Sequence, residues 1–274
     1  MKKHPKKDKK KRSGRPEKPT QKQPTKHENR FKPANLYGFH AVREALLNQD
    51  RHIQALYVSE NALEGIQETL EEARRRGLTR PSPQVLDKQA LEKTLPPGAV
   101  HQGLALVCSS LPEFGLQDLL IRERDQDHSV LLILDQITDP HNVGALLRSA
   151  CAFGAAGIIM QTRHAPDLSG VLAKTASGAL EHVPVAFETN LNRAIETLQE
   201  HGYFVYGLDE RGKDIATANT SGKSALVLGA EGPGLRRLVK EHCDELIALP
   251  MHGQMPSINV SNAGAVALYE FSKN

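Results

Sequence analysis

Three polar segments of the chain carry side chains that can bind an anion and order a reactive group. The first, DQITDPHNVGALLRSACAFG at 135–154, holds Asn142 and Arg148, and the Arg148 guanidinium is its only strong cation. A guanidinium offers a planar fork of N–H donors that fits a phosphate or a developing oxyanion. Because this group stays protonated in proteins, we expect it to anchor and stabilise charge rather than act as a general base.

The second segment, GAEGPGL at 229–235, sets Glu231 among glycines. This carboxylate is either a solvated turn residue or an organiser of Asn142 or Arg148. The glycines indicate a turn that needs positive φ. Their spacing departs from G-x-G-x-x-G, and no acidic residue follows at the distance expected for a dinucleotide ribose. The segment therefore argues against a nicotinamide-dependent oxidoreductase.

The third segment, PMHGQMPSINVSN at 250–262, contains Ser257 and Asn259. The spacing predicts a final helix over 257–271, at whose start Ser257 is favoured as a cap. Asn142 has the same structural alternative, since it can cap a helix that Gly154 ends. Capping and a chemical role are compatible at both positions.

Strands and helices alternate from residue 130 onward, and this alternation places the three segments. The strands are predicted by apolar runs at 131–135, 157–160, 183–187, 203–208, 225–229 and 245–250. Such near-continuous runs between helices predict a mostly parallel sheet covered on both faces. In an open sheet of this kind, ligands bind beyond the carboxyl ends of the strands, where all three segments begin. We therefore expect an α/β domain at 130–274.

A small α+β unit is expected before it, at 36–110. Helical spacing over 37–48, 63–76 and 88–95 alternates with strand patterns at 53–59 and 101–109. Residues 111–129 contain prolines, glycine and a charged RERDQDH run, and we expect a linker with one short helix.

Charge is divided unevenly along the chain. Residues 1–35 carry a net charge of +11, and the rest of the chain sums to −8. Only three residues of the first stretch are apolar, too few for a core that offsets the entropy of ordering, so we expect a disordered basic tail. Such a tail adds salt-dependent affinity for nucleic acid. The arginines at 74–76 and Arg80 either orient RNA or form a solvated helix end.

Several protein classes are excluded by composition. No run of eighteen apolar residues and no secretory signal occur, which predicts a cytoplasmic protein, with an organelle transit peptide as the alternative. Cys108, Cys151 and Cys243 are an odd number at wide spacing, so we expect small apolar residues, no disulfide framework and no metal site. The absence of tryptophan and 4% aromatic residues argue against a base-stacking RNA-binding sheet.

The three segments, in this order, resemble the signature motifs of the SPOUT methyltransferases, in the SpoU/TrmH branch that methylates ribose 2′-hydroxyls in RNA. This resemblance covers residues 130–274 and implies a trefoil-knotted α/β domain. YGFHAV at 37–42 and HQG at 101–103 resemble the L30-like substrate-binding domain of rRNA-directed members. LPM and SINVS stand where IPM and SLNVS are usual, and both departures keep an apolar side chain.

The resemblance implies functional residues, position by position. The side chains are Asn142, Arg148, Glu231, Ser257 and Asn259. The methyl donor is S-adenosylmethionine, held largely through backbone groups at Gly229, Leu249 and Ile258.

The resemblance also implies the reaction and the partners. It points to an enzyme that methylates the 2′-hydroxyl of a guanosine in large-subunit (23S-type) rRNA and forms a homodimer on its last helix. An L30-like domain favours rRNA, because tRNA enzymes of the branch lack it. A tRNA ribose methyltransferase is the first alternative. A noncatalytic RNA-binding protein is the second, and the intact set of polar residues argues against it.

Overall fold

The computed structural model describes Met1 and residues 31–273. The basic tail expected at 1–35 therefore lies mostly outside the described residues. Its last part is described: Phe31 packs edge-on against Tyr57 with ring centroids 5.7 Å apart, and the Ala34 N–H donates to the Thr94 carbonyl at 2.8 Å. Residues 31–35 thus belong to the folded chain.

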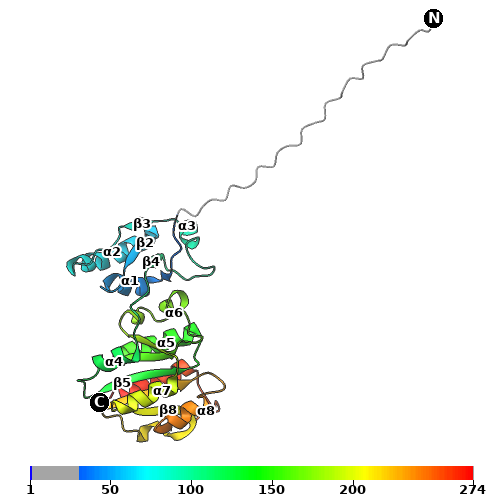
Figure 1. The fold of residues 1–274 in the computed structure, drawn as a ribbon. Helices are drawn as coiled ribbons and strands as arrows, with labels where there is room; N and C mark the ends of the chain where they lie inside the picture. Colours follow the sequence, from blue (N-terminus) through cyan, green and yellow to red (C-terminus); the bar gives the residue numbers. More distant parts are fainter. Residues whose placement is uncertain (2–30, 274) are drawn as a thin grey trace. The chain divides into compact units, whose positions relative to one another are not determined.

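Six strands form one sheet in the order β10-β8-β9-β5-β6-β7, and every neighbouring pair is parallel. Two of them, β5 and β8, are labelled in Figure 1. The predicted α/β fold with a mostly parallel sheet is confirmed. From β5 the chain moves outward to β7 and then crosses to the other side of β5. The strands are β5 (Ser129–Asp135), β6 (Gly157–Gln161), β7 (Val185–Glu188), β8 (Phe204–Asp214), β9 (Lys223–Gly229) and β10 (Glu245–Ala248).

Helices cover both faces of this sheet because the residues of β5 from Val130 to Leu134 are all apolar and successive side chains point to opposite sides. Leu132 and Leu134 share a core cluster with residues of α5, α6 and α9. Leu131 and Ile133 share a second cluster with residues of α4, α7 and α8. The helices are α4 (Leu116–Arg122), α5 (Pro140–Ala152), α6 (Gly170–Thr175), η1 (Ala179–Glu181), α7 (Leu191–Glu200), η2 (Ile215–Thr217), α8 (Arg237–His242) and α9 (Val260–Phe271).

The preceding part of the chain forms a four-stranded sheet in the order β1-β4-β2-β3 with helices α1 to α3. Strand β4 is antiparallel to β1 and β2, whereas β3 pairs parallel with β2. Strands β1 and β3 were not predicted, because two and three residues show no alternating pattern. The elements are β1 (Leu36–Tyr37), α1 (Phe39–Leu47), β2 (Ile53–Val58), α2 (Glu60–Arg75), β3 (Pro83–Val85), α3 (Lys88–Glu92) and β4 (Leu104–Cys108).

Two capping predictions were wrong. Helix α5 begins at Pro140, and the Asp139 side chain caps it by accepting from the His141 N–H at 3.0 Å, so Asn142 lies inside the first turn. Proline favours this first position because it lacks an N–H and its φ is already helical. Helix α9 begins at Val260, and Asn259 rather than Ser257 is its cap.

Three of the four arginines at 74–76 and 80 have structural partners. Arg75 and Arg76 pair with Glu72 at 2.7 and 2.8 Å, and the hydrogen bond from Arg76 lowers the pKa of Glu72. Arg80 donates to the carbonyls of Leu46 and Asn48 at 2.7 and 2.6 Å. Arg80 therefore completes the end of α1 and does not serve as a free RNA contact.

The cysteines are free thiols, as predicted. Cys108 is buried and Cys151 and Cys243 are half-buried. Burial raises the pKa of the Cys243 thiol to about 12. Within residues 31–273, no group of three or more His, Cys, Asp or Glu side chains is placed so that it could hold a metal ion. No helix of the described chain is long and apolar enough to cross a membrane.

Helix α9 approaches α5 closely at Gly264. A methyl group at this position would overlap the side chains of Leu146 of α5 and Leu228 of β9. Small residues of this helix can serve packing within the chain or contact between subunits. At Gly264 the small residue is required by packing within the chain.

Gly264→Val is expected to lower the free energy of unfolding by about 1–3 kcal/mol, because the added carbons overfill the contact with Leu146 and Leu228. Urea denaturation measures the loss. Asn262→Val, at an exposed position of the same helix, is the control and should change stability by at most about 0.5 kcal/mol. Equal losses in the two variants would contradict the packing role.

Candidate functional site

One side chain from each polar segment joins a hydrogen-bonded ring. Asn142 Nδ2 donates to Glu231 Oε1 at 3.1 Å, and Asn259 Nδ2 donates to the same oxygen at 2.5 Å. Asn259 Nδ2 also donates to Asn142 Oδ1 at 3.0 Å. Since the carboxylate is acceptor-only, these bonds fix which way both amides face. Glu231 is an exposed turn residue, and its carboxylate also accepts from the Asn142 amide.

Local structure explains how the ring forms. Asp135 and Gly229 lie opposite each other at the ends of the parallel neighbours β5 and β9, so the loops that follow leave the sheet together. Asn259 uses its other end as a helix cap, because its Oδ1 accepts from the Ser261 N–H at 2.8 Å and from Ser261 Oγ at 2.5 Å. The amide of Asn259 thus serves the helix and the ring at once.

Glycine shapes the turn that holds Glu231. The Gly234 N–H donates to the Ala230 carbonyl at 2.9 Å, and Gly232 and Gly234 have φ values of +84° and +66°. The predicted positive-φ turn is confirmed at these two positions. Gly229 is required for another reason, because a methyl group there would overlap the backbone of Gly234 and Leu235.

A cavity of about 780 Å³ opens beside the ring, between β8 and the loops that follow β9 and β10. This volume is typical of small-molecule sites, which span roughly 300–1,000 Å³. Asn142 does not itself line the cavity, but it is hydrogen-bonded to Glu231 and Asn259, which do. Six of the eight predicted site residues line it: Gly229, Glu231, Leu249, Ser257, Ile258 and Asn259.

Charged residues of β8 also line the cavity, and the sequence analysis missed them. Asp209, Glu210 and Arg211 lie on one side, and Lys240 of α8 forms an ion pair with Asp209. Burial acts to raise the pKa of Asp209, but hydrogen bonds from the Lys240 side chain and the Arg211 backbone outweigh it and lower that pKa. The sequence feature that could have indicated these residues is the charged run DERGKD, which directly follows the apolar run at 203–208.

Arg148 is the predicted residue that the structure does not bring to the cavity. It lies on α5 six residues after Asn142, which places it about 120° away around the helix axis. Its side chain is exposed and makes no hydrogen bond or ion pair within the described part of the chain. The guanidinium is therefore free to contact another molecule.

A buried carboxylate ties down the far end of the second segment. Asp135, fully buried at the end of β5, accepts from the Arg236 N–H at 2.9 Å and from Arg236 Nε at 2.7 Å. Arg236 is the residue before α8. The glycine-rich turn is thus held at both ends, by β9 and by Asp135.

Two family models match this chain. The SpoU rRNA methylase family matches residues 129–269, about half of the chain, and the model for RNA 2′-O ribose methyltransferase substrate binding matches residues 36–114. This chain belongs to the SpoU rRNA methylase family. The ring and the cavity lie within the first match, and the four-stranded sheet lies within the second.

Curated members of the family are similar over most of their length. The chain is 38% identical to the putative TrmH family tRNA/rRNA methyltransferase YacO of Bacillus subtilis, covering 86% of this chain and 93% of that one. It is 39% identical to the 23S rRNA (guanosine-2′-O-)-methyltransferase RlmB of Pasteurella multocida, covering 86% and 96%. An uncharacterized tRNA/rRNA methyltransferase of Synechocystis is 39% identical, but the chain spans 61% of its length.

Solved structures share the fold. The SpoU methyltransferase AviRb from Streptomyces viridochromogenes, in complex with AdoMet, superposes with a TM-score of 0.70 at 22% identity, over 87% of this chain and 89% of that one. An AdoMet-bound rRNA methyltransferase from Sinorhizobium meliloti gives a TM-score of 0.69 at 21% identity, over 87% and 86%. The SpoU fold is therefore shared despite low sequence identity.

S-adenosylmethionine is the methyl donor of the family, and the cavity has the features that this cofactor needs. Gly229 keeps backbone groups uncovered at the end of β9, so a ligand can approach the main chain closely. Leu249 and Ile258 offer apolar surface for an adenine, and the charged residues of β8 offer partners for polar groups. These residues would hold the cofactor.

Asn142→Ala is expected to lower the kcat of methyl transfer by about 10²-fold, because the ring loses one donor to Glu231 and one acceptor for Asn259. Radiolabelled methyl incorporation into RNA measures kcat. Cofactor affinity, measured by calorimetry, should stay unchanged because Asn142 does not line the cavity. Glu200→Ala, exposed at the end of α7, is the control. A normal kcat in Asn142→Ala would contradict a functional ring.

Proposed function

We propose that this protein transfers a methyl group from S-adenosylmethionine to the ribose 2′-hydroxyl of a guanosine in large-subunit rRNA. The observation that carries the proposal is the ring of Asn142, Glu231 and Asn259 beside the cavity. The proposed division is a basic tail, an RNA-binding domain that ends near residue 110, a linker at 111–129 and a catalytic domain at 130–274. The trefoil knot of the catalytic domain stays a prediction.

Two findings support rRNA as the substrate. Relatives that match over nearly their whole length include 23S rRNA (guanosine-2′-O-)-methyltransferases. The substrate-binding model matches residues 36–114, which is the part that tRNA enzymes of the branch lack. A tRNA substrate is the second candidate, favoured by the tRNA/rRNA names of other relatives.

The chemistry divides between the cofactor and the protein. The bound cofactor supplies an electrophilic methyl group. We assign Arg148 to the phosphate of the target nucleotide, where its fork of donors favours negative charge on the 2′-oxygen while the hydroxyl proton leaves to phosphate or water. Ser257, exposed where it lines the cavity, donates to the same nucleotide. Glu231 and the two amides hold the loops around it in one arrangement.

A homodimer explains why Arg148 lies outside the cavity of its own chain. Helix α9 exposes Val266 and Tyr269, and Tyr269 packs edge-on against Phe153, which follows α5, with centroids 5.8 Å apart. The proposed dimer interface is this α9 face. In that dimer, Arg148 of α5 would complete the site of the partner subunit.

The cell location and the tail complete the proposal. A cytoplasmic location fits a substrate that is ribosomal RNA. The basic residues before Phe31 would add affinity that falls with salt, through release of counterions from the RNA backbone.

The reaction is tested by incubating the purified protein with labelled S-adenosylmethionine and either total rRNA or total tRNA. We expect label in large-subunit rRNA, and a primer-extension stop at one guanosine ribose. Label confined to tRNA would favour the second candidate. Cofactor binding without label in any RNA would support a noncatalytic RNA-binding protein.

Subunit mixing tests the role of Arg148. Arg148→Ala and Asn142→Ala proteins should each be nearly inactive, whereas a mixture that exchanges subunits should regain roughly a quarter of wild-type activity, because half of the dimers then carry one intact site. Sedimentation at micromolar concentration confirms the dimer. An exchanged mixture that stays inactive would place Arg148 in the site of its own subunit, and a monomer would contradict the interface.

A further inference from the structure

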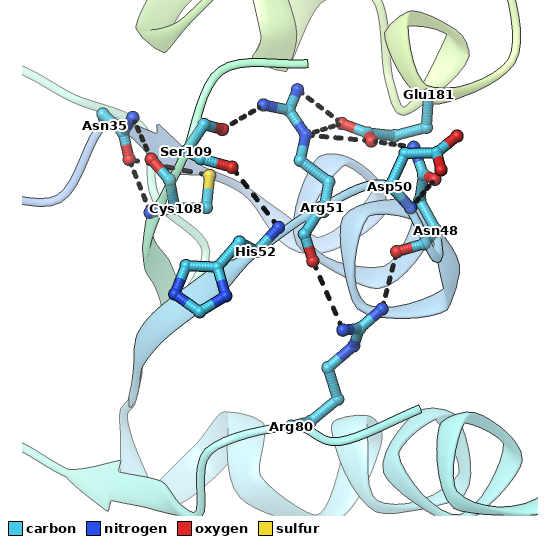
Figure 2. A network of polar contacts seen from close by, with 9 residues as sticks. All are labelled: Asn35, Asn48, Asp50, Arg51, His52, Arg80, Cys108, Ser109 and Glu181. Carbon is cyan, nitrogen blue, oxygen red and sulfur yellow. Dashed lines mark hydrogen bonds and ion pairs between the residues drawn. The ribbon is translucent and has the colours of Figure 1, made fainter. Parts of the chain in front are cut away.

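A buried ion pair joins the N-terminal sheet domain to the catalytic domain. Arg51, before β2, meets Glu181, the last residue of η1 (Figure 2). Arg51 Nε lies 3.0 Å from both Glu181 carboxylate oxygens, and Arg51 Nη2 lies 2.8 Å from Oε1. The two side chains are 4% and 1% exposed, so water screens the pair very little.

Further hydrogen bonds fix the pair in place. Arg51 Nη1 donates to the Ser109 carbonyl at 2.7 Å, and Asn48 Nδ2 donates to Glu181 Oε2 at 2.7 Å. Arg80 lies beneath and donates to the carbonyls of Asn48 and Arg51 (Figure 2). The Glu181 carboxylate therefore bonds directly to residues at the end of α1 and the start of β2. Through Arg51 it is also linked to the end of β4.

Glu181 belongs to the segment that contains α6 and η1, and this segment lies against the start of α5. Helices α6 and η1 pack against α5. The contact is close at Gly144, where a methyl group would overlap the Thr175 side chain and the Leu172 carbonyl. Gly144 lies two residues after Asn142. The N-terminal domain is thus attached to the same segment that positions a member of the ring.

Apolar contact alone does not define this orientation. Ala41 and Ala45 of α1 share a core cluster with Leu172 and Ala176, but apolar burial is non-directional. A cavity of about 600 Å³ lined by residues of both domains, among them Arg51 and Glu181, also adjoins the pair, so packing there is incomplete. A bidentate ion pair fixes direction as well as distance.

We infer that Arg51 and Glu181 are positioning residues for methyl transfer, which hold the RNA-binding domain in one orientation so that bound RNA presents a single ribose to the catalytic cavity. Neither residue lines the cavity beside the ring. The inference rests on the proposed function, because it concerns how that substrate is presented.

Glu181→Gln tests the inference, because it removes the charge and keeps an acceptor for Asn48. We expect kcat on rRNA to fall about tenfold, with methylation spreading to neighbouring nucleotides and cofactor affinity unchanged. The matched control is Glu44→Gln, which removes the charge from a more exposed contact to His182 Nε2 at 3.0 Å in the same junction and should behave as wild type. Wild-type kcat and one methylated position in Glu181→Gln would overturn the inference.

A double variant separates positioning from stability. Arg51→Met with Glu181→Leu replaces the pair by apolar side chains of similar volume, an exchange that is often neutral for stability. We expect urea denaturation close to wild type, together with the low kcat and spread methylation of Glu181→Gln. A double variant with wild-type kcat at a single position would show that the pair serves stability alone.

Small-angle X-ray scattering decides the orientation without any substrate. The wild-type protein is expected to give the profile of one domain arrangement, and both variants a larger maximum dimension. Identical profiles would overturn the inference. Failure of the wild-type protein to methylate any RNA would remove the proposed function instead, and the scattering comparison would still decide whether the pair fixes the orientation.

Discussion

The site depends on the parallel register of β5 and β9. With Asp135 opposite Gly229 at the carboxyl ends, the chain leaves both strands at the same edge of the sheet. The first polar segment then enters α5, and the second makes the glycine-rich turn. Asp135 itself has no exposure, and its two bonds from Arg236 satisfy a charge that would otherwise be costly to bury. The same carboxylate therefore ends one segment and fixes the next.

Buried and exposed ion pairs of this molecule differ in how much the loss of one partner changes the free energy of unfolding. Arg75 and Arg76 pair with Glu72 in solvent, where water screens the charges and such pairs add little stability. Removing one partner of a buried pair costs about 3–5 kcal/mol, because it leaves an uncompensated charge. The Arg51–Glu181 pair is of this second kind and spans two domains. A cost of that size is a large part of a total stability of about 5–15 kcal/mol.

Much of the fold was predictable because its signals are local. The apolar runs of β5, β6 and β9 and the helical spacing of α2 correspond closely to the observed elements. The cavity residues Glu231, Ser257 and Asn259 were found through the resemblance to a family. Asp209 and Lys240 were not, since they are far apart in sequence and meet only when β8 and α8 pack. The Arg51–Glu181 pair was missed for the same reason.

The helix caps show a different limit. Asn142 and Asn259 are the same residue type, yet only Asn259 caps its helix. Asp139 caps α5 instead of Asn142, because the following Pro140 favours the start of a helix. Propensity ranks residue types, but it does not choose between two candidates three residues apart. The position of Arg148 could not be predicted either, because its distance from the cavity depends on how α5 rotates against α9.

Asn259 is the last of the three ring members to be synthesised. Its side chain caps α9 and closes the ring, and it follows Asn142 by 117 residues and Glu231 by 28. Because a chain emerges from its N-terminus, Asn142 and Glu231 leave the ribosome before their third partner. A nascent chain can therefore fold the N-terminal domain and most of the parallel sheet while it still lacks a complete ring.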